Sequence, residues 1–99
     1  MSVYVIAQLF ITDRAAYGRY QERFIGVLKR FNGRLLAADE RPLVLEGTWQ
    51  GDKVVLLCFP GEVDFCEWAE SAEYQEIARD RKAGASATVL LVHGISAPG

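Results

Sequence analysis

The sequence has few residues of the kinds that build metal centres or attach cofactors. Its 99 residues include one histidine and two cysteines. Cys58 and Cys66 form no CxxC motif, and a single histidine cannot supply a histidine-rich metal site. We therefore expect no metal and no cofactor. Without a secretory context, both cysteines are expected to be reduced interior residues, with a disulfide or a reactive thiol as the alternative.

Long apolar runs and an excess of positive charge are also missing. No apolar run approaches the ~20 residues of a membrane-spanning helix. Residues 1–5 lack the basic region and cleavage site of a signal peptide, so they favour a first strand and a cytoplasmic protein without membrane contact. The net charge of −2 disfavours nucleic acid as a partner. No glycine-rich phosphate loop or nucleophile elbow occurs, so a nucleotide cofactor is not expected either.

The composition is that of a folded globular chain, with 51% apolar and 24% charged residues. A chain of 99 residues is long enough for one core and too short for two. We expect one domain over residues 1–99, with a frayed end over residues 96–99.

Three segments predict strands that are apolar on both faces: Val3–Ile11, Val54–Phe59 and Thr88–Ile95. Strands that face water on one side normally alternate apolar with polar residues. Two amphipathic helices can cover one face of such a sheet. The other face needs another cover, and a second copy of the chain is the simplest candidate.

Two helical regions separate these strands. The first follows a cap at Thr12 or Asp13, carries apolar residues at three–four spacing from Tyr17 onward, and stops at Asn32-Gly33. The second begins near Glu62, bends near Ser71-Ala72 and closes at Gly84. Ser71 is expected to cap the segment after the bend.

Two shorter extended segments are predicted at Arg34–Asp39 and Leu43–Trp49. The resulting order is β-α-β-β-α-β with one extra short strand, which predicts an α+β ferredoxin-like plait with both helices on one face. Pairing of the bare face with a second copy would bury on the order of 800 Å² per subunit and give a homodimer.

Several motifs occur in a fixed order along nearly the whole chain. They are Tyr17-x-x-Tyr20, Gly33-Arg34-Leu35-Leu36, Leu45-Glu46-Gly47-Thr48-Trp49, Phe59-Pro60, the run WAESAEYQ over residues 68–75, and Arg81. In these motifs the sequence resembles the uncharacterised family called domain of unknown function 1330. The resemblance implies a dimeric α/β barrel, in a superfamily that includes cofactor-free monooxygenases, small-molecule isomerases and haem-degrading enzymes. It implies no particular reaction. The haem-degrading relatives use a histidine on a helix, and the predicted helices here contain none.

Three residues are candidates for catalysis: Glu46, Arg34 and His93. If the two short strands form a hairpin around Arg41, Arg34 becomes a diagonal neighbour of Glu46. A half-buried Glu46 carboxylate could then act as a general base on a carbon acid, or it could form a structural pair with Arg34. His93 is either an acid–base group or a satisfied core or interface residue.

Six further residues are candidates for substrate binding: Tyr17, Tyr20, Trp49, Trp68, Tyr74 and Arg81. Tyrosines and tryptophans on helices above a sheet can line a cleft, or they can be core residues with the polar atom at the rim. Arg81 could clamp a carboxylate or bridge to nearby acidic groups.

These groups, placed in apolar stripes, indicate a cleft between sheet and helices for a small organic acid or aromatic molecule. The preferred hypothesis is a cofactor-independent enzyme, isomerase- or monooxygenase-like. The alternative is a non-catalytic ligand-binding or structural homodimer.

Overall fold

The computed structural model describes residues 1–95, so the predicted frayed end at 96–99 lies outside the described residues. The chain forms four strands and three helices. They are β1 (Val3–Ile11), α1 (Arg14–Arg30), β2 (Arg34–Asp39), β3 (Lys53–Phe59), α2 (Glu62–Glu70), α3 (Ala72–Gly84) and β4 (Ala85–His93). All strand pairs are antiparallel, and the strand order across the sheet is β2-β3-β1-β4.

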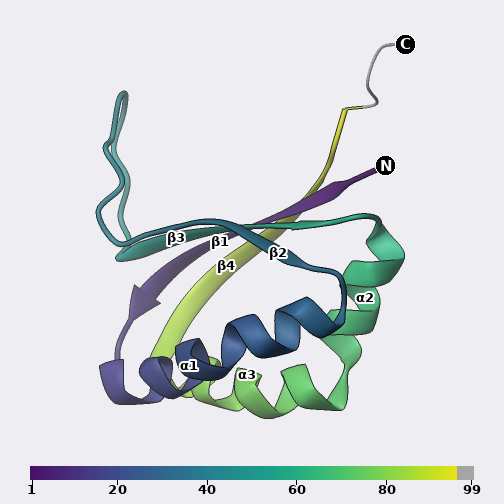
Figure 1. Cartoon of the computed structure of the whole chain (residues 1–99). Helices are drawn as coiled ribbons and strands as arrows, with labels where there is room; N and C mark the ends of the chain where they lie inside the picture. Colours follow the sequence, from purple (N-terminus) through teal and green to yellow (C-terminus); the bar gives the residue numbers. More distant parts are fainter. Residues whose placement is uncertain (96–99) are drawn as a thin grey trace.

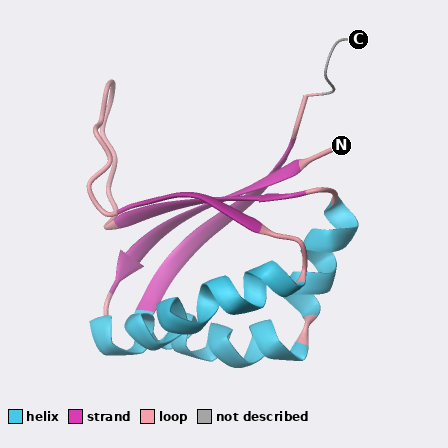
Figure 2. Ribbon diagram, viewed as in Figure 1, coloured by secondary structure: helices cyan, strands magenta, loops and turns pink. Residues whose placement is uncertain are grey.

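All three helices lie against the same face of this sheet (Figure 1). The opposite face carries no helix, as the ribbon coloured by secondary structure shows (Figure 2). The predicted ferredoxin-like β-α-β-β-α-β order is confirmed, with the second helical region divided into α2 and α3. We call the helix-covered side the inner face and the bare side the outer face.

Helix α1 begins and ends where local sequence signals place its ends. The Asp13 carboxylate accepts hydrogen bonds from the backbone N–H groups of Ala15 and Ala16, at 3.0 and 3.3 Å. Asn32, at φ +64°, takes the left-handed conformation that ends the helix. Both predicted boundaries are confirmed.

Ser71 forms the junction between α2 and α3. Its backbone is extended, with φ −65° and ψ 148°, which interrupts the helix. Its hydroxyl donates to the Trp68 carbonyl at 2.8 Å and accepts from the Tyr74 N–H at 3.1 Å. The predicted bend and cap are therefore confirmed, and the bend brings the Trp68 and Tyr74 rings to a centroid distance of 4.0 Å.

The start of α1 packs directly on the end of α3. The Gly84 carbonyl accepts hydrogen bonds from the N–H groups of Thr12 and Asp13, at 2.8 and 3.1 Å. A Cβ at Gly84 would lie 2.6 Å from the Tyr17 nitrogen and 2.7 Å from the Asp13 carbonyl oxygen. This close backbone contact requires glycine.

The strand register assigns each apolar residue to one face of the sheet. Directly paired residues share a face, so Val5 lies beside Leu57 and Leu91 on the inner face. Ile6, one residue later, points outward. The outer face gathers apolar side chains from all four strands. They are Tyr4, Ile6, Phe10, Ala37, Val54, Leu56, Leu90 and Val92.

The two cysteines have different environments. Cys58 on β3 is buried and Cys66 on α2 is exposed, and both are free thiols. The expectation of an interior cysteine is right for Cys58 and wrong for Cys66. Cys66 lies on the solvent side of α2, whereas Trp68 of the same helix enters the core.

The predicted extra strand at Leu43–Trp49 is wrong. Residues 40–52 form a long loop, here called the arm, which projects from one end of the sheet on the side opposite the helices (Figure 1). Leu43 and Leu45 are 83% and 87% exposed. Strand β2 pairs with β3 instead of with the arm, and β4 begins three residues earlier than predicted, directly after α3.

Candidate functional site

A cavity of about 440 Å³ lies between the inner face of the sheet and the helices. All four strands and all three helices contribute to its lining. Its floor is apolar and includes Val5, Ala7 and Leu57. A space of this size accommodates a small organic molecule.

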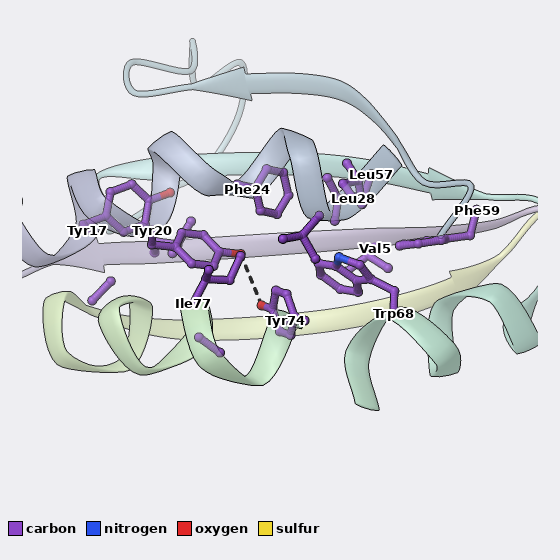
Figure 3. Close-up of a cluster of buried hydrophobic side chains, with 14 of the residues drawn as sticks. Val5, Tyr17, Tyr20, Phe24, Leu28, Leu57, Phe59, Trp68, Tyr74 and Ile77 are labelled. Carbon is purple, nitrogen blue, oxygen red and sulfur yellow. Dashed lines mark hydrogen bonds between the residues drawn. The ribbon is translucent and has the colours of Figure 1, made fainter. Parts of the chain in front are cut away.

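Aromatic side chains from the helices form the wall opposite the sheet (Figure 3). On α1, Tyr20 lies 5.8 Å from Tyr17 and 5.4 Å from Phe24, between ring centroids. Trp68 of α2 meets Phe24 edge-on at 6.2 Å. These contacts hold the rings in fixed orientations, which defines the shape of the cavity.

Two tyrosine hydroxyls meet inside this wall. The Tyr20 and Tyr74 oxygens are 3.2 Å apart, in a buried hydrogen bond drawn as a dashed line in Figure 3. Burial raises the pKa of Tyr20 far above its ordinary value, and the neighbouring Tyr74 raises it further. Burial also raises the pKa of Tyr17. Both phenols therefore stay neutral and can donate hydrogen bonds at any physiological pH.

Lys53 is a buried cation in this lining that the sequence analysis missed. It opens β3 on the inner face, opposite Leu9, and is only 3% exposed. Its Nζ lies 4.9 Å from the centroid of the Tyr17 ring, and no ion pair to it occurs within residues 1–95. Burial lowers the pKa of its amine, and the Glu40 carboxylate opposes this shift only in part. The inward alternation of Lys53, Val55, Leu57 was the signal that could have identified it.

Two buried N–H groups among the lining residues have no partner. Arg81 Nε and Trp68 Nε1 are both buried, and neither makes a hydrogen bond within the described chain. An unpaired buried donor costs about 1–3 kcal/mol, so each such group calls for an explanation. A bound ligand with acceptor atoms would provide one.

No carboxylate belongs to the cavity lining among residues 1–95. The acidic side chains of α3 instead face α1 at the surface, where they form the ion pairs Arg19–Asp80, Arg23–Glu76 and Arg30–Glu73. Glu40, on the arm, raises the pKa of Tyr17 and pairs with Arg14 at 2.8 Å. The cavity is therefore apolar and aromatic with positive charge, which suits an organic anion.

Five of the six predicted substrate-binding residues line this cavity. They are Tyr17, Tyr20, Trp68, Tyr74 and Arg81. The sequence pattern could place them together because all are on the inward stripe of a helix. Trp49 is the exception: it lies on the arm, and its Nε1 donates to Gln8 Oε1 at 3.4 Å on the outer face.

The three predicted catalytic residues all lie outside the cavity. Glu46 is exposed at a bend of the arm, and Arg34 lies on the outer face with a guanidinium nitrogen 3.9 Å from Cys58 Sγ. The expected Arg34–Glu46 neighbourhood within one chain is wrong because the arm never pairs with β2. His93 is exposed, with Nε2 2.7 Å from Glu62 Oε1.

Within residues 1–95, no group of three or more His, Cys, Asp or Glu side chains is placed to hold a metal ion. Within the same range, no helix is both long and apolar enough to cross a membrane.

The sequence pattern of the family described as "Domain of unknown function (DUF1330)" matches residues 2–95. The chain belongs to this family. The family description carries no activity. A search of curated proteins found no match by sequence.

Solved structures share the fold at low sequence identity. RPA0582, a protein of unknown function from Rhodopseudomonas palustris, superposes with a TM-score of 0.82 at 17% identity, over 96% of this chain and 83% of that one. SnoaB, a cofactor-independent oxygenase from Streptomyces nogalater, gives 0.70 at 12% identity, over 96% and 94%. A dimeric ferredoxin-like protein of unknown function from Jannaschia sp. CCS1 gives 0.71 at 14%, over 95% and 100%. At these identities the likeness establishes the fold alone.

Proposed function

We propose that this DUF1330 protein binds an apolar, partly aromatic organic anion in the cavity and acts on it without a cofactor. One observation carries the proposal: Lys53 and Arg81 bring positive charge into a cavity whose described lining has no carboxylate. Burying a cation that has no ion-pair partner is costly, and an anionic ligand would pair with both groups.

Arg81 is the proposed anchor for the anion. A guanidinium remains charged at all relevant pH values and can bind a carboxylate or an enolate through two parallel hydrogen bonds. Its Nε already lacks a hydrogen-bond partner. The ligand's oxygens would satisfy this donor, and the rings of Tyr17 and Tyr20 would contact its apolar part.

Lys53 is the proposed proton acceptor. Among the ionisable lining groups, the tyrosines are held neutral by their raised pKa values and Arg81 is permanently charged. Lys53 differs because burial lowers its pKa, so its neutral amine is more accessible than that of an ordinary lysine. Removal of a proton from a carbon acid by this amine would leave an enolate beside two cations, which is electrostatically favourable.

Such an enolate is the common intermediate of two reactions. Return of the proton at a different carbon isomerises the substrate. Transfer of electrons from the enolate to dioxygen starts an oxygenation in which the substrate itself is the reductant. SnoaB is a cofactor-independent oxygenase with the same fold, which supports the second reaction as a candidate here.

We further propose that the protein is a homodimer assembled through the outer face. That face exposes apolar side chains, including Phe10, Leu90 and Val92 at 47%, 48% and 41%. Contiguous apolar surface of this kind marks an interaction site in water-exposed proteins. The structural neighbour from Jannaschia is itself dimeric, which is consistent with this assembly.

The first test is a thermal-shift screen with matched ligand pairs. Aromatic and aliphatic carboxylic acids are compared with their uncharged amides. A ligand present at a hundred times its dissociation constant adds about 2.7 kcal/mol to the unfolding free energy. Stabilisation by acids but not amides, lost in Arg81→Gln, supports the anion site. Equal stabilisation by both members of each pair would contradict it.

The second test separates the charge of Lys53 from its basicity. Lys53→Arg keeps a cation but is far too weak a proton acceptor, whereas Lys53→Met removes both functions. With any acid found in the screen, Lys53→Arg should still bind but should lose exchange of the ligand's acidic C–H with deuterium, followed by NMR. Dioxygen uptake, measured with an electrode, then distinguishes oxygenation from isomerisation. Unchanged exchange in Lys53→Arg would exclude Lys53 as the base.

The alternative function is a homodimer that binds a ligand or serves structure without catalysis. It is favoured by the position of Glu46, Arg34 and His93, all of which lie outside the cavity. Under this alternative, acids would stabilise the protein while neither deuterium exchange nor dioxygen uptake occurs with any of them.

A further inference from the structure

The two ends of the outer face carry charges without an ion pair in the described chain, mostly acidic at the arm end, where Asp39 and Glu46 lie, and basic at the other end. At one end lies the arm, whose tip contains Glu46. At the other end lies Arg34, the first residue of β2. The two ends are separated by the length of β2, about 17 Å at ~3.3 Å per residue, and the arm adds to this distance (Figure 1).

Glu46 is placed so that it meets nothing in its own chain. The chain bends at Glu46 and Gly47, which has φ +83°, about midway along the arm. The Glu46 carboxylate forms no hydrogen bond or ion pair within residues 1–95, and its neighbour Leu45 is almost fully exposed. An apolar tip that carries one charge and lacks a packing partner is unfavourable in water.

Arg34 is similarly unpaired. Its register partner Cys58 lies beside Tyr4, which places Arg34 on the outer face. The one polar contact of its guanidinium within residues 1–95 is the weak acceptor Cys58 Sγ at 3.9 Å. No carboxylate of the described chain lies within ion-pair distance of it.

We propose that Glu46 of each subunit pairs with Arg34 of a second copy of this chain across the outer face. This inference rests on the proposed homodimer and specifies its geometry. The arm of one subunit reaches over the β2 start of the other, and symmetry repeats the contact, so the dimer contains two such ion pairs.

Charge complementarity selects this geometry. When two copies of a sheet stack face to face, the two-fold axis that relates them lies between the sheets and parallel to them. It can run either along the strands or across them. An axis along the strands places the two Glu46 carboxylates at one end and the two Arg34 guanidinium groups at the other, which is repulsive at both ends. An axis across the strands reverses the strand direction of one sheet relative to the other. The Glu46 carboxylate of each subunit then lies at the same end as the Arg34 guanidinium of the other subunit.

The arm also forms a groove that a second copy can fill. A hollow of about 430 Å³ lies between the arm and the outer face, lined by Leu43, Leu45, Glu46 and Trp49 from the arm and by Gln8 and Val54 from the sheet. Gln8 and Val54 are each two residues from the apolar residues Ile6 and Leu56 on the same face. A stable dimer typically buries ~800 Å² per subunit, which sets the area that the face and the arm together would have to cover.

The test is a charge exchange measured by the dimer dissociation constant. Glu46→Arg and Arg34→Glu are each expected to raise this constant at least tenfold, because each variant places like charges together. The double variant should restore it to within about threefold of the unchanged protein. Sedimentation at several protein concentrations measures the constant, and circular dichroism checks that each variant is folded. If either reversal fails to fold, Glu46→Gln and Arg34→Gln replace it in the same cycle.

Two control variants separate this pair from general charge effects. Glu22→Arg makes the same change of charge on the exposed side of α1 and should leave the constant unchanged. Asp39→Arg combined with Arg34→Glu tests the competing partner, because Asp39 lies on the same face at the base of the arm. Restoration by this combination and not by Glu46→Arg with Arg34→Glu would overturn the Glu46–Arg34 pair.

The outcomes distinguish this inference from the proposed homodimer. A dimer whose constant is not restored in the double variant would overturn the Glu46–Arg34 pair and leave the homodimer intact. A protein that remains monomeric at every concentration would overturn both. If the dissociation constant is raised in each single variant and restored in the double variant, both the Glu46–Arg34 pair and the homodimer are supported.

Discussion

The two faces of the sheet have nearly the same apolar composition and opposite surroundings. The inner face presents residues such as Val5 and Leu57 to three helices, and a cavity remains between them. The outer face presents Ile6, Leu56 and Leu90 to nothing in the described chain. Apolar surface stabilises a protein only when it is removed from water. Folding of one chain removes the inner face from water and leaves the outer face exposed to it.

The difference lies in what reaches each face. The inner face also receives Lys53 and Arg81, which are charged groups in a place where charge is costly. The outer face has its charged residues at the ends and none at its centre. Charge within an enclosed space indicates a ligand, whereas charge around an apolar patch is typical of a protein interface.

The largest effect is expected from truncating matched phenylalanines, one on each face. Phe59 on the inner face is 0% exposed and contacts Phe65 and Trp68 at centroid distances of 5.7 and 5.3 Å. Phe59→Ala should lower the unfolding free energy by about 3–5 kcal/mol. Phe10→Ala, on the outer face, should change it by about 0.5 kcal/mol or less when urea unfolding is followed at concentrations that keep the protein monomeric. Equal losses would mean that both faces are equally packed within one chain.

The second effect concerns assembly alone. Leu90→Asp places a charge at the centre of the outer face and should convert the proposed dimer to monomer at micromolar concentration, observed by light scattering. Its control is Val63→Asp on α2, at a residue that is 70% exposed. A dimer that survives Leu90→Asp would show that the outer face is not the interface.

The sequence predicted most of the architecture because local signals determine it. The cap at Asp13, the stop at Asn32 and the break at Ser71 each depend on neighbouring residues, and each is confirmed. Residues 43–49 of the arm were predicted as a short strand on their local sequence alone. A strand also needs an edge to pair with, and β2 uses its available edge for β3, which no local pattern shows.

The site was predicted in part for the same reason. The aromatic wall follows from helical spacing, so Tyr20 and Tyr74 were identified from the sequence. The positions of the charged residues on the strands and the arm depend on strand register and on the end of the sheet at which each residue lies. For this reason Lys53 was missed, and Glu46 and Arg34 were expected as neighbours although they lie at opposite ends of the outer face.

The third effect is a pH dependence that belongs to the inner face. Burial lowers the pKa of Lys53 below the 10.5 of an ordinary lysine. At pH values between the lowered pKa of the folded chain and the ordinary pKa of the unfolded chain, the unfolded chain binds more protons. The contribution of Lys53 to the free energy of unfolding therefore rises with pH in this range. Lys53→Met should therefore be more stable than the unchanged protein at neutral pH, and this advantage should vanish above pH 10.5.

The measurement is urea unfolding of both proteins at several pH values. The raised pKa values of the tyrosines act equally in the two proteins and cancel in the difference. A difference that does not change with pH would mean that Lys53 keeps an ordinary pKa.

The smallest effect is expected at the tyrosine pair. Tyr20→Phe removes the buried hydrogen bond to Tyr74 and should cost about 1 kcal/mol. Tyr74→Phe should cost a similar amount, and the double variant should cost less than the sum because the two hydroxyls share one bond. Additive losses in urea unfolding would mean that each hydroxyl has a separate partner.

The two tryptophans give the protein a built-in optical reporter for each face. Trp68 is buried among the cavity rings, 4.0 Å from Tyr74, and its indole N–H is free to meet a ligand. Trp49 lies on the arm, bonded to Gln8 on the other side of the sheet. With one tryptophan replaced by phenylalanine at a time, the emission of Trp68 would follow binding of the proposed ligand in the cavity, and that of Trp49 would follow formation of the proposed dimer. Binding and assembly can thus be recorded separately in unlabelled protein.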